Sequence, residues 1–260
     1  MNQKLIHASR ILREDIFSLR GPEHCGSFLK LLARVNSMSA RNAVLLYFQK
    51  PDTVMAAGYY VWKERYGRCV KKGEKALTIL SKRGNMDDPS SLRTISVFDV
   101  SQTAGNPLPP GVLPGNSHDP QEYSLLLEAA VLASPLPVHF EEIPDGSSGY
   151  FRPIDRDIII RSGMSLSETF HTVMREAARA LLYERNPLQS EECRRRRAFE
   201  AECSAFALCS FFGFSSKEPA GCFDDLNTTE ELLASFERIR SVCSRQINEV
   251  RRIRCPDIRN

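Results

Sequence analysis

The stretch AGYYVWKERYGRCVKKGEKALTIL, at residues 57–80, decides how the first half of the chain is interpreted. It combines aromatic and β-branched residues in short runs that glycines interrupt, a pattern typical of a small antiparallel sheet. The expected strands span residues 55–62, 76–80 and 94–100. Apolar residues at helical spacing predict three helices before this sheet, near residues 5–16, 28–35 and 43–48.

Basic side chains are concentrated in the same stretch. From Lys63 to Arg83 there are eight basic residues and two acidic ones, with tyrosines and the only tryptophan close by. Cations neutralise phosphates, and exposed aromatic rings accept unpaired bases, so this combination favours single-stranded nucleic acid. The alternative is that Trp62 and Tyr60 lie in the core and that the lysines form only a solvated surface. The chain carries 35 Lys+Arg against 32 Asp+Glu, so a polyanion has to be bound by local clustering of charge.

Spaced motifs surround this basic stretch. N-x-x-L-L begins at Asn42, Q-x-P at Gln49, G-x-x-x-W-K at Gly58, GR-x-V-K-K-G-E-K at Gly67 and D-V-S-Q-T at Asp99. Together they resemble the N-terminal single-stranded-DNA-binding domain of ArdC-type antirestriction proteins and their LtrC-like relatives. The resemblance implies a DNA-facing surface here and a role in protecting incoming DNA from host defence. The predicted nucleic-acid-binding residues are Tyr60, Trp62, Lys63, Arg68, Lys71, Lys72 and Lys75.

A segment rich in proline and glycine separates two parts of the chain. Residues 101–120 hold five prolines and three glycines without a periodic apolar pattern, so they cannot continue a helix or a central strand. We predict a single-stranded-DNA-binding domain over residues 1–105, a linker over 106–120 and a second domain over 121–260. The expected fold class is α+β, with N-terminal helices and a small antiparallel sheet followed by a C-terminal domain of helices and strands.

The second part has clear signals for the ends of its helices. Capping boxes begin at Ser165 and Thr228, each with a glutamate three residues later, and Gly213 is placed to end a long helix that starts near Glu191. A further helix is expected from about Pro120 to Ala133. The expected strands cover residues 135–140 and 157–160.

The helix that follows Ser165 carries the sequence Arg175-Glu176-Ala-Ala-Arg179. Relatives of the family named above often have a zincin domain similar to the ImmA/IrrE peptidases, with H-E-x-x-H on one helix and E-A-E on the next. The second motif is present from Glu200 to Glu202, and the resemblance therefore puts Arg175 and Arg179 at the positions of the two histidines. Zinc needs neutral imidazole lone pairs, whereas a guanidinium stays protonated, has no lone pair and repels a dication.

These substitutions predict a pseudoenzyme without a catalytic residue, a metal or a cofactor. Glu176 is then a vestige of the general base, because it has no metal-bound water to deprotonate. We expect the guanidinium of Arg175 or Arg179 to pair with the carboxylate of Glu200 and so to join the two helices without a metal. The alternative is that both arginines are exposed to solvent and unpaired.

The predicted partner is single-stranded DNA, with a host defence protein as a second candidate and no membrane. Two other functions stay open: a protein-binding module that uses the inactive cleft, and a zinc metallopeptidase with non-standard ligands. The eight cysteines form no C-x-x-C pair and no apolar leader is visible, so we expect a reduced, cytoplasmic protein with mostly buried cysteines. Arginines at 194–197 and in the last helix could extend a phosphate-binding surface, although such runs are usually solvated helix faces.

Overall fold

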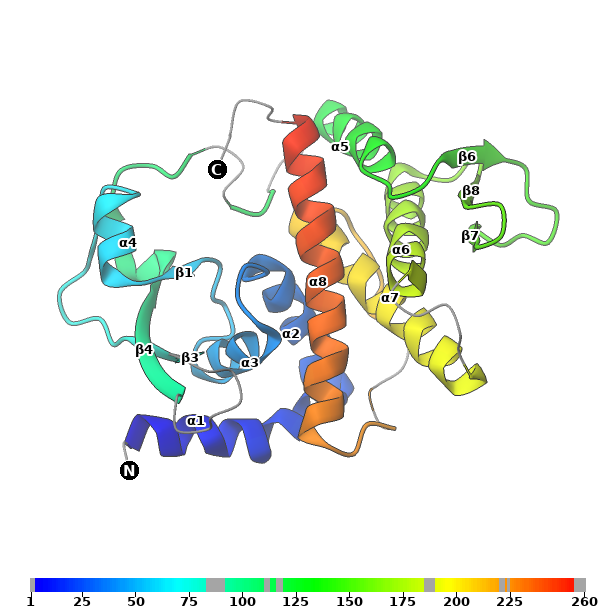
Figure 1. The fold of residues 1–260 in the computed structure, drawn as a ribbon. Helices are drawn as coiled ribbons and strands as arrows, with labels where there is room; N and C mark the ends of the chain where they lie inside the picture. Colours follow the sequence, from blue (N-terminus) through cyan, green and yellow to red (C-terminus); the bar gives the residue numbers. More distant parts are fainter. Residues whose placement is uncertain are drawn as a thin grey trace. The chain divides into compact units, whose positions relative to one another are not determined.

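The structure, a computed structural model, describes residues 3–82, 92–109, 113–115, 119–184, 190–219, 223 and 225–254 (Figure 1). The chain divides into two compact units. The first consists of Met1–Leu113 and Cys222–Ala234, and the second of Pro114–Gly221 and Ser235–Asn260. The sequence-based boundaries placed residues 222–234 in the second domain, so they differ from this division. Within the described residues, no helix is long and apolar enough to cross a membrane.

Helices build most of the first unit. They are α1 (Gln3–Arg13), the 3₁₀ turn η1 (Asp15–Arg20), α2 (Pro22–Arg34), α3 (Ala40–Gln49) and α4 (Tyr59–Glu64). Ile16 and Leu19 of η1 are completely buried, as are most apolar residues of α2 and α3, so these elements share one core. The three helices expected before the sheet are confirmed, except that the first ends at Arg13 and Ile16 belongs to η1.

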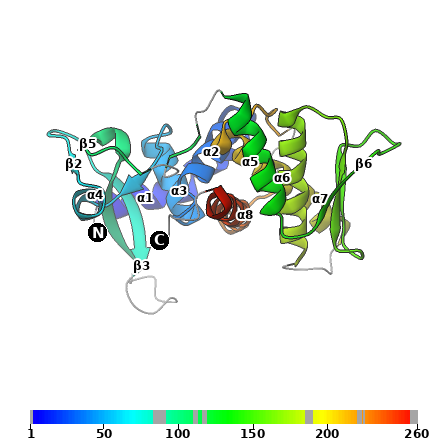
Figure 2. The ribbon, with the colours of Figure 1, turned by 90° about the horizontal axis from the view of Figure 1, so that it is seen from above.

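Two small antiparallel sheets complete the first unit. β1 (Ala56–Ala57), β4 (Leu92–Asp99) and β3 (Leu77–Lys82) pair in that order, and β2 (Arg68–Val70) pairs with β5 (Thr103–Gly105). Figure 2 shows β2 and β5 beside α4, and α4 packs against β2. The strand expected at 55–62 is wrong beyond Ala57, because residues 59–64 form α4. Short aromatic and β-branched runs do not distinguish a strand from a buried helical turn.

The outer edge of β3 is covered by two amide side chains from α3. Asn42 donates to the carbonyl oxygen of Leu80 and accepts from its N–H, each at 2.9 Å. Gln49 does the same for Thr78, at 2.8 and 2.7 Å. Strand edges otherwise expose unpaired backbone groups to other chains. These two motif residues therefore stabilise the sheet rather than bind a ligand.

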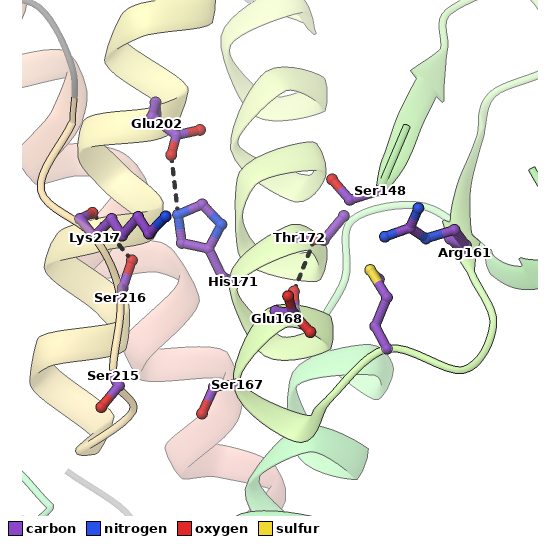
Figure 3. A pocket seen from close by; sticks show the side chains of 11 residues that line it. Ser148, Arg161, Ser167, Glu168, His171, Thr172, Glu202, Ser215, Ser216 and Lys217 are labelled. Carbon is purple, nitrogen blue, oxygen red and sulfur yellow. Dashed lines mark hydrogen bonds and ion pairs between the residues drawn. The ribbon is translucent and has the colours of Figure 1, made fainter. Parts of the chain in front are cut away.

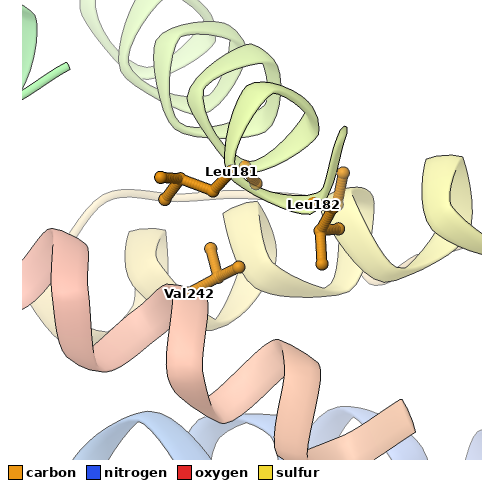
Figure 4. Packing of buried hydrophobic residues seen from close by; sticks show 5 residues of the cluster. Leu181, Leu182 and Val242 are labelled. Carbon is orange, nitrogen blue, oxygen red and sulfur yellow. The ribbon is translucent and has the colours of Figure 1, made fainter. Parts of the chain in front are cut away.

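The second unit packs helices against a mixed sheet. Its elements are α5 (Pro120–Leu132), β6 (Val138–Glu141), β7 (Gly149–Arg152), β8 (Asp157–Arg161), α6 (Leu166–Glu184), α7 (Glu191–Phe212) and α8 (Thr229–Arg254) from Ser235 onwards. β8 lies in the centre, parallel to β6 and antiparallel to β7, and its three isoleucines are completely buried. Leu181 and Leu182 of α6 pack with Val242 of α8 (Figure 4). β7 was not among the strands predicted from the sequence.

The predicted helix ends are confirmed. In the box at Ser165, the Glu168 N–H donates to Ser165 Oγ and the Glu168 carboxylate accepts from the Ser165 N–H. Thr228 and Glu231 make the same reciprocal pair. Gly213 has φ 84°, the left-handed conformation that a glycine tolerates best, and it ends α7. Four of the six cysteines in the described part of the chain are buried: Cys25, Cys203, Cys209 and Cys243.

Candidate functional site

The basic turn, residues 71–75, connects β2 to β3 and is held in place by Gln102. The N–H of Lys71 donates to the Gln102 carbonyl at 2.9 Å. The Gln102 amide nitrogen donates to the Glu74 carboxylate at 3.0 Å and to the Lys75 carbonyl at 2.8 Å. Its amide oxygen accepts from the Asp99 N–H. The D-V-S-Q-T motif therefore positions the turn that carries the lysines.

Arg68 also has a structural role. Its guanidinium donates to Thr103 Oγ1 at 2.8 Å, to the Thr103 carbonyl at 3.1 Å and to the Asn106 carbonyl. These bonds tie β2 to β5 and use donors that a phosphate would need. Arg68 was predicted to bind nucleic acid, but in the structure three of its five N–H donors bond to Thr103 and Asn106.

The lysines of this region are exposed and mostly unpaired. Lys63, Lys72 and Lys75 are exposed, and their ammonium groups have no hydrogen-bond or ion-pair partner among the described residues. Lys71 is also exposed and donates to the Ser101 carbonyl at 2.8 Å. Four of the predicted binding residues are thus exposed cations, one on α4 and three in the basic turn. Arg83, at the end of the basic stretch, lies outside the described residues.

The two aromatic residues predicted for this surface lie on opposite sides of α4. Trp62 is completely buried, and its indole N–H donates to the Phe98 carbonyl at 2.9 Å. The prediction that Trp62 lies on the binding surface is therefore wrong for this conformation. Tyr60 is two residues earlier, about 200° away around the helix, and is 70% exposed. A helix, unlike a strand, puts residues i and i+2 on different faces.

In the second unit, the arginine pair of α6 surrounds a buried carboxylate. Glu176 is completely buried, with Arg175 Nε 2.7 Å from its Oε1 and Arg179 Nη1 3.2 Å from its Oε2. Arg175 Nη2 also donates to Ser148 Oγ at 2.9 Å, and its Nη1 lies 3.9 Å from Glu202 Oε2 on α7. The guanidinium of Arg175 therefore connects α6 to α7 and to the start of β7.

The expected pairing of these arginines with Glu200 is wrong. Glu200 is completely buried and accepts from Ser235 Oγ at 2.6 Å and from the Arg238 guanidinium at 2.6 to 3.1 Å, both on α8. Residues two apart on a helix do not share a face, so Glu200 contacts α8 while Glu202 faces α6. The sequence led to the prediction of Glu200 as the carboxylate partner on α7, whereas the carboxylate of α7 that Arg175 approaches is Glu202.

His171 and Glu202 meet in a cleft of about 560 Å³ (Figure 3). His171 Nε2 lies 3.1 Å from Glu202 Oε1, and this contact, followed by the charges of Arg175 and Arg179, lowers the pKa of Glu202. The remaining wall is mainly hydroxyl groups with two cations, and the cleft is lined by Ser148, Arg161, Met164, Ser167, Glu168, His171, Thr172, Glu202, Ser215, Ser216 and Lys217. Of these residues, Glu202 belongs to the E-A-E motif recognised in the sequence, whereas the serines carry no positional signal.

The donors of this cleft do not suit a divalent metal ion. Within the described ranges, no three His, Cys, Asp or Glu side chains are grouped so that they could hold one. Arg175 and Arg179 bring two permanent positive charges to the helix face where lone pairs are needed. A metallopeptidase with non-standard ligands therefore gains no support from the residues present.

Most arginines of α7 and α8 are paired with acidic residues, either of the same helix or of a neighbouring one. Arg194 lies 2.7 Å from Glu191, and Arg252 lies 2.7 Å from Glu249. Arg197 donates to the Leu182 carbonyl. These arginines fit a solvated helix surface better than a phosphate-binding one, in contrast with the unpaired lysines of the first unit.

No family model and no curated protein matches this chain. Among solved structures it is similar to the Mn(II)-bound structure of the antirestriction protein ArdC from plasmid R388, with 15% identity, a TM-score of 0.55, and 96% of this chain and 98% of that chain covered. The metal-free structure of the same protein is similar at 17% identity, a TM-score of 0.48, and 85% and 87% coverage. The first match shows that this chain has an ArdC-like α+β fold over nearly its whole length.

Proposed function

We propose that this chain is an antirestriction protein of a mobile element or phage that captures single-stranded DNA with its first unit. The observation that carries this proposal is the set of exposed, unpaired lysines on α4 and the basic turn, Lys63, Lys72 and Lys75. The ArdC-like fold, shared with a plasmid antirestriction protein, supports the biological role. Binding alone is sufficient for that role, because a strand that is covered by protein is not accessible to a nuclease.

Phosphate capture makes a quantitative prediction for the basic turn. Each lysine that neutralises a phosphate of a single strand contributes about 0.7 to the slope of log K against log salt. The double variant Lys72→Ala/Lys75→Ala should therefore lose about 1.4 from this slope. When the salt concentration is raised from about 50 to 200 mM, the factor by which the parent loses affinity should be roughly seven times the factor for the variant.

Fluorescence anisotropy with labelled single- and double-stranded oligonucleotides measures this effect. Arg194→Ala/Arg252→Ala is the matched control, because it removes the same charge from two arginines that pair within their own helices. The control should keep the slope of the parent. If the lysine variant binds single strands with unchanged affinity and slope, the proposed surface is not the binding site.

The second unit is proposed to be a peptidase-like domain without metal and without activity. Its support is the replacement of metal donors by guanidinium groups, which satisfy Glu176 and approach Glu202 directly. Metal analysis of the purified protein tests this part, and one equivalent of zinc or manganese bound in the second unit would overturn it. A Glu176→Gln variant should show the same peptidase background as the parent.

A second candidate function is the binding of a host defence protein in the cleft of the second unit. The cleft is large, lined with hydroxyl groups and contains the cations Arg161 and Lys217. A defence protein that is retained after nuclease treatment, and lost with Arg161→Ala/Lys217→Ala, would favour this function. Retention that depends on nucleic acid would favour the first unit instead.

A further inference from the structure

α4 exposes an apolar surface that the fold does not explain. Tyr59 is 46%, Tyr60 70% and Val61 43% exposed, and these are the only three consecutive large apolar residues exposed in the described chain. Trp62 already supplies the contact of this helix with the core. Single exposed apolar residues are ordinary, whereas a contiguous group next to free cations indicates a ligand.

The geometry of this surface suits a flat ring. The rings of Tyr59 and Tyr60 lie 5.6 Å apart and perpendicular to each other. Because they are perpendicular, only one of them can lie parallel to a given base, and Tyr60 is the more accessible. Lys63 is three residues after Tyr60 and so lies on the same side of α4 as that ring, while β2, the strand leading into the basic turn, packs against the same helix.

We propose that Tyr60, supported by Tyr59 and Val61, stacks on unpaired bases and makes the site select single strands. This proposal rests on the proposed function and assigns the part of the site that recognises bases. A duplex offers its phosphates to the lysines, but its base faces are covered by their neighbours. A single strand offers its phosphates and its base faces, so stacking raises the affinity for single strands but not for duplexes. Trp62, the residue that the sequence motif favours, takes no part in stacking because it is buried.

The experiment is a thermodynamic cycle in which the aromatic ring of Tyr60 is removed from the protein and the bases are removed from the oligonucleotide. The parent and Tyr60→Ala are titrated with labelled oligothymidylate and with an abasic strand of equal length, which keeps every phosphate. Stacking of about 1–3 kcal/mol per base predicts that the parent prefers oligothymidylate by about 5- to 140-fold. Tyr60→Ala should bind both strands equally, whereas Tyr60→Phe should keep the preference. The salt slope should not change, because no charge is removed.

Ile6→Ala is the control, since Ile6 is an exposed apolar residue of α1 in the same unit. It should bind like the parent. The proposal is overturned if Tyr60→Ala retains the preference for bases, if the parent shows none, or if Ile6→Ala has the same effect. The proposed function is tested by a separate variant, and it fails if Lys72→Ala/Lys75→Ala binds single strands like the parent. Loss of the lysine effect and loss of the base preference are therefore distinguishable outcomes.

Discussion

Histidines in place of Arg175 and Arg179 should convert the arginine cluster of α6 into a metal site. The double substitution Arg175→His/Arg179→His restores two imidazoles at i and i+4 on one helix face, with Glu202 of α7 nearby. It also removes both partners of the buried Glu176 carboxylate. The variant should therefore lose stability without metal and recover part of it when metal binds.

The size of both effects follows from burial. Glu176 is completely buried and Arg175 is 17% exposed, so loss of their pairing should cost about 3–5 kcal/mol. Arg179 is 37% exposed, and its share is smaller because solvent screens it. This loss corresponds to a decrease in Tm of roughly 10–20 °C for a unit of this size. Metal at about 100 times its Kd should return about 2.7 kcal/mol.

Thermal unfolding with zinc, manganese or a chelator, together with metal analysis after dialysis, measures these effects. Arg175→Ala/Arg179→Ala is the matched control, because it loses the same guanidinium groups without gaining a metal donor. It should be destabilised and should not respond to metal. The reasoning is refuted if the histidine variant takes up no more metal than the alanine variant, or if neither variant is less stable than the parent.

Three further predictions test the packing and the charges. Trp62→Ala should destabilise the protein by about 3–5 kcal/mol in chemical denaturation, and in the parent the emission of this sole tryptophan should barely change when oligonucleotide is added. Arg238→Ala should destabilise by about 3–5 kcal/mol because it leaves the buried Glu200 without its charged partner, whereas Arg238→Lys should lose less. The contact with His171 holds the pKa of Glu202 below its ordinary 4.5, so this carboxylate stabilises the fold above that pH and ceases to do so as the pH falls through the lowered value. When the pH is lowered from about 6 to 3, the Tm of Glu202→Gln should therefore fall less steeply than the Tm of the parent.

Motifs in the first unit could be recognised from sequence, but their roles could not. Asn42, Gln49 and Gln102 belong to motifs that resemble those of a DNA-binding domain, yet all three bond to backbone groups and hold the sheet edge or the basic turn. A side-chain amide can satisfy a backbone or a base equally well. Which of the two it meets depends on the segment that folds next to it, and sequence spacing does not contain that information.

Local features could be predicted from the sequence: every long helix, several of the helix caps, the clustering of lysines, and the absence of imidazoles from positions 175 and 179. These follow from residue chemistry and from contacts within a few positions of the chain. The tertiary structure decided that Trp62 points inward and Tyr60 outward, and that Glu202 rather than Glu200 faces Arg175. Such choices depend on which face of a helix meets a distant element. If a helix were rotated about its axis by the angle of one or two residues, buried and exposed side chains would be exchanged although the composition would be the same.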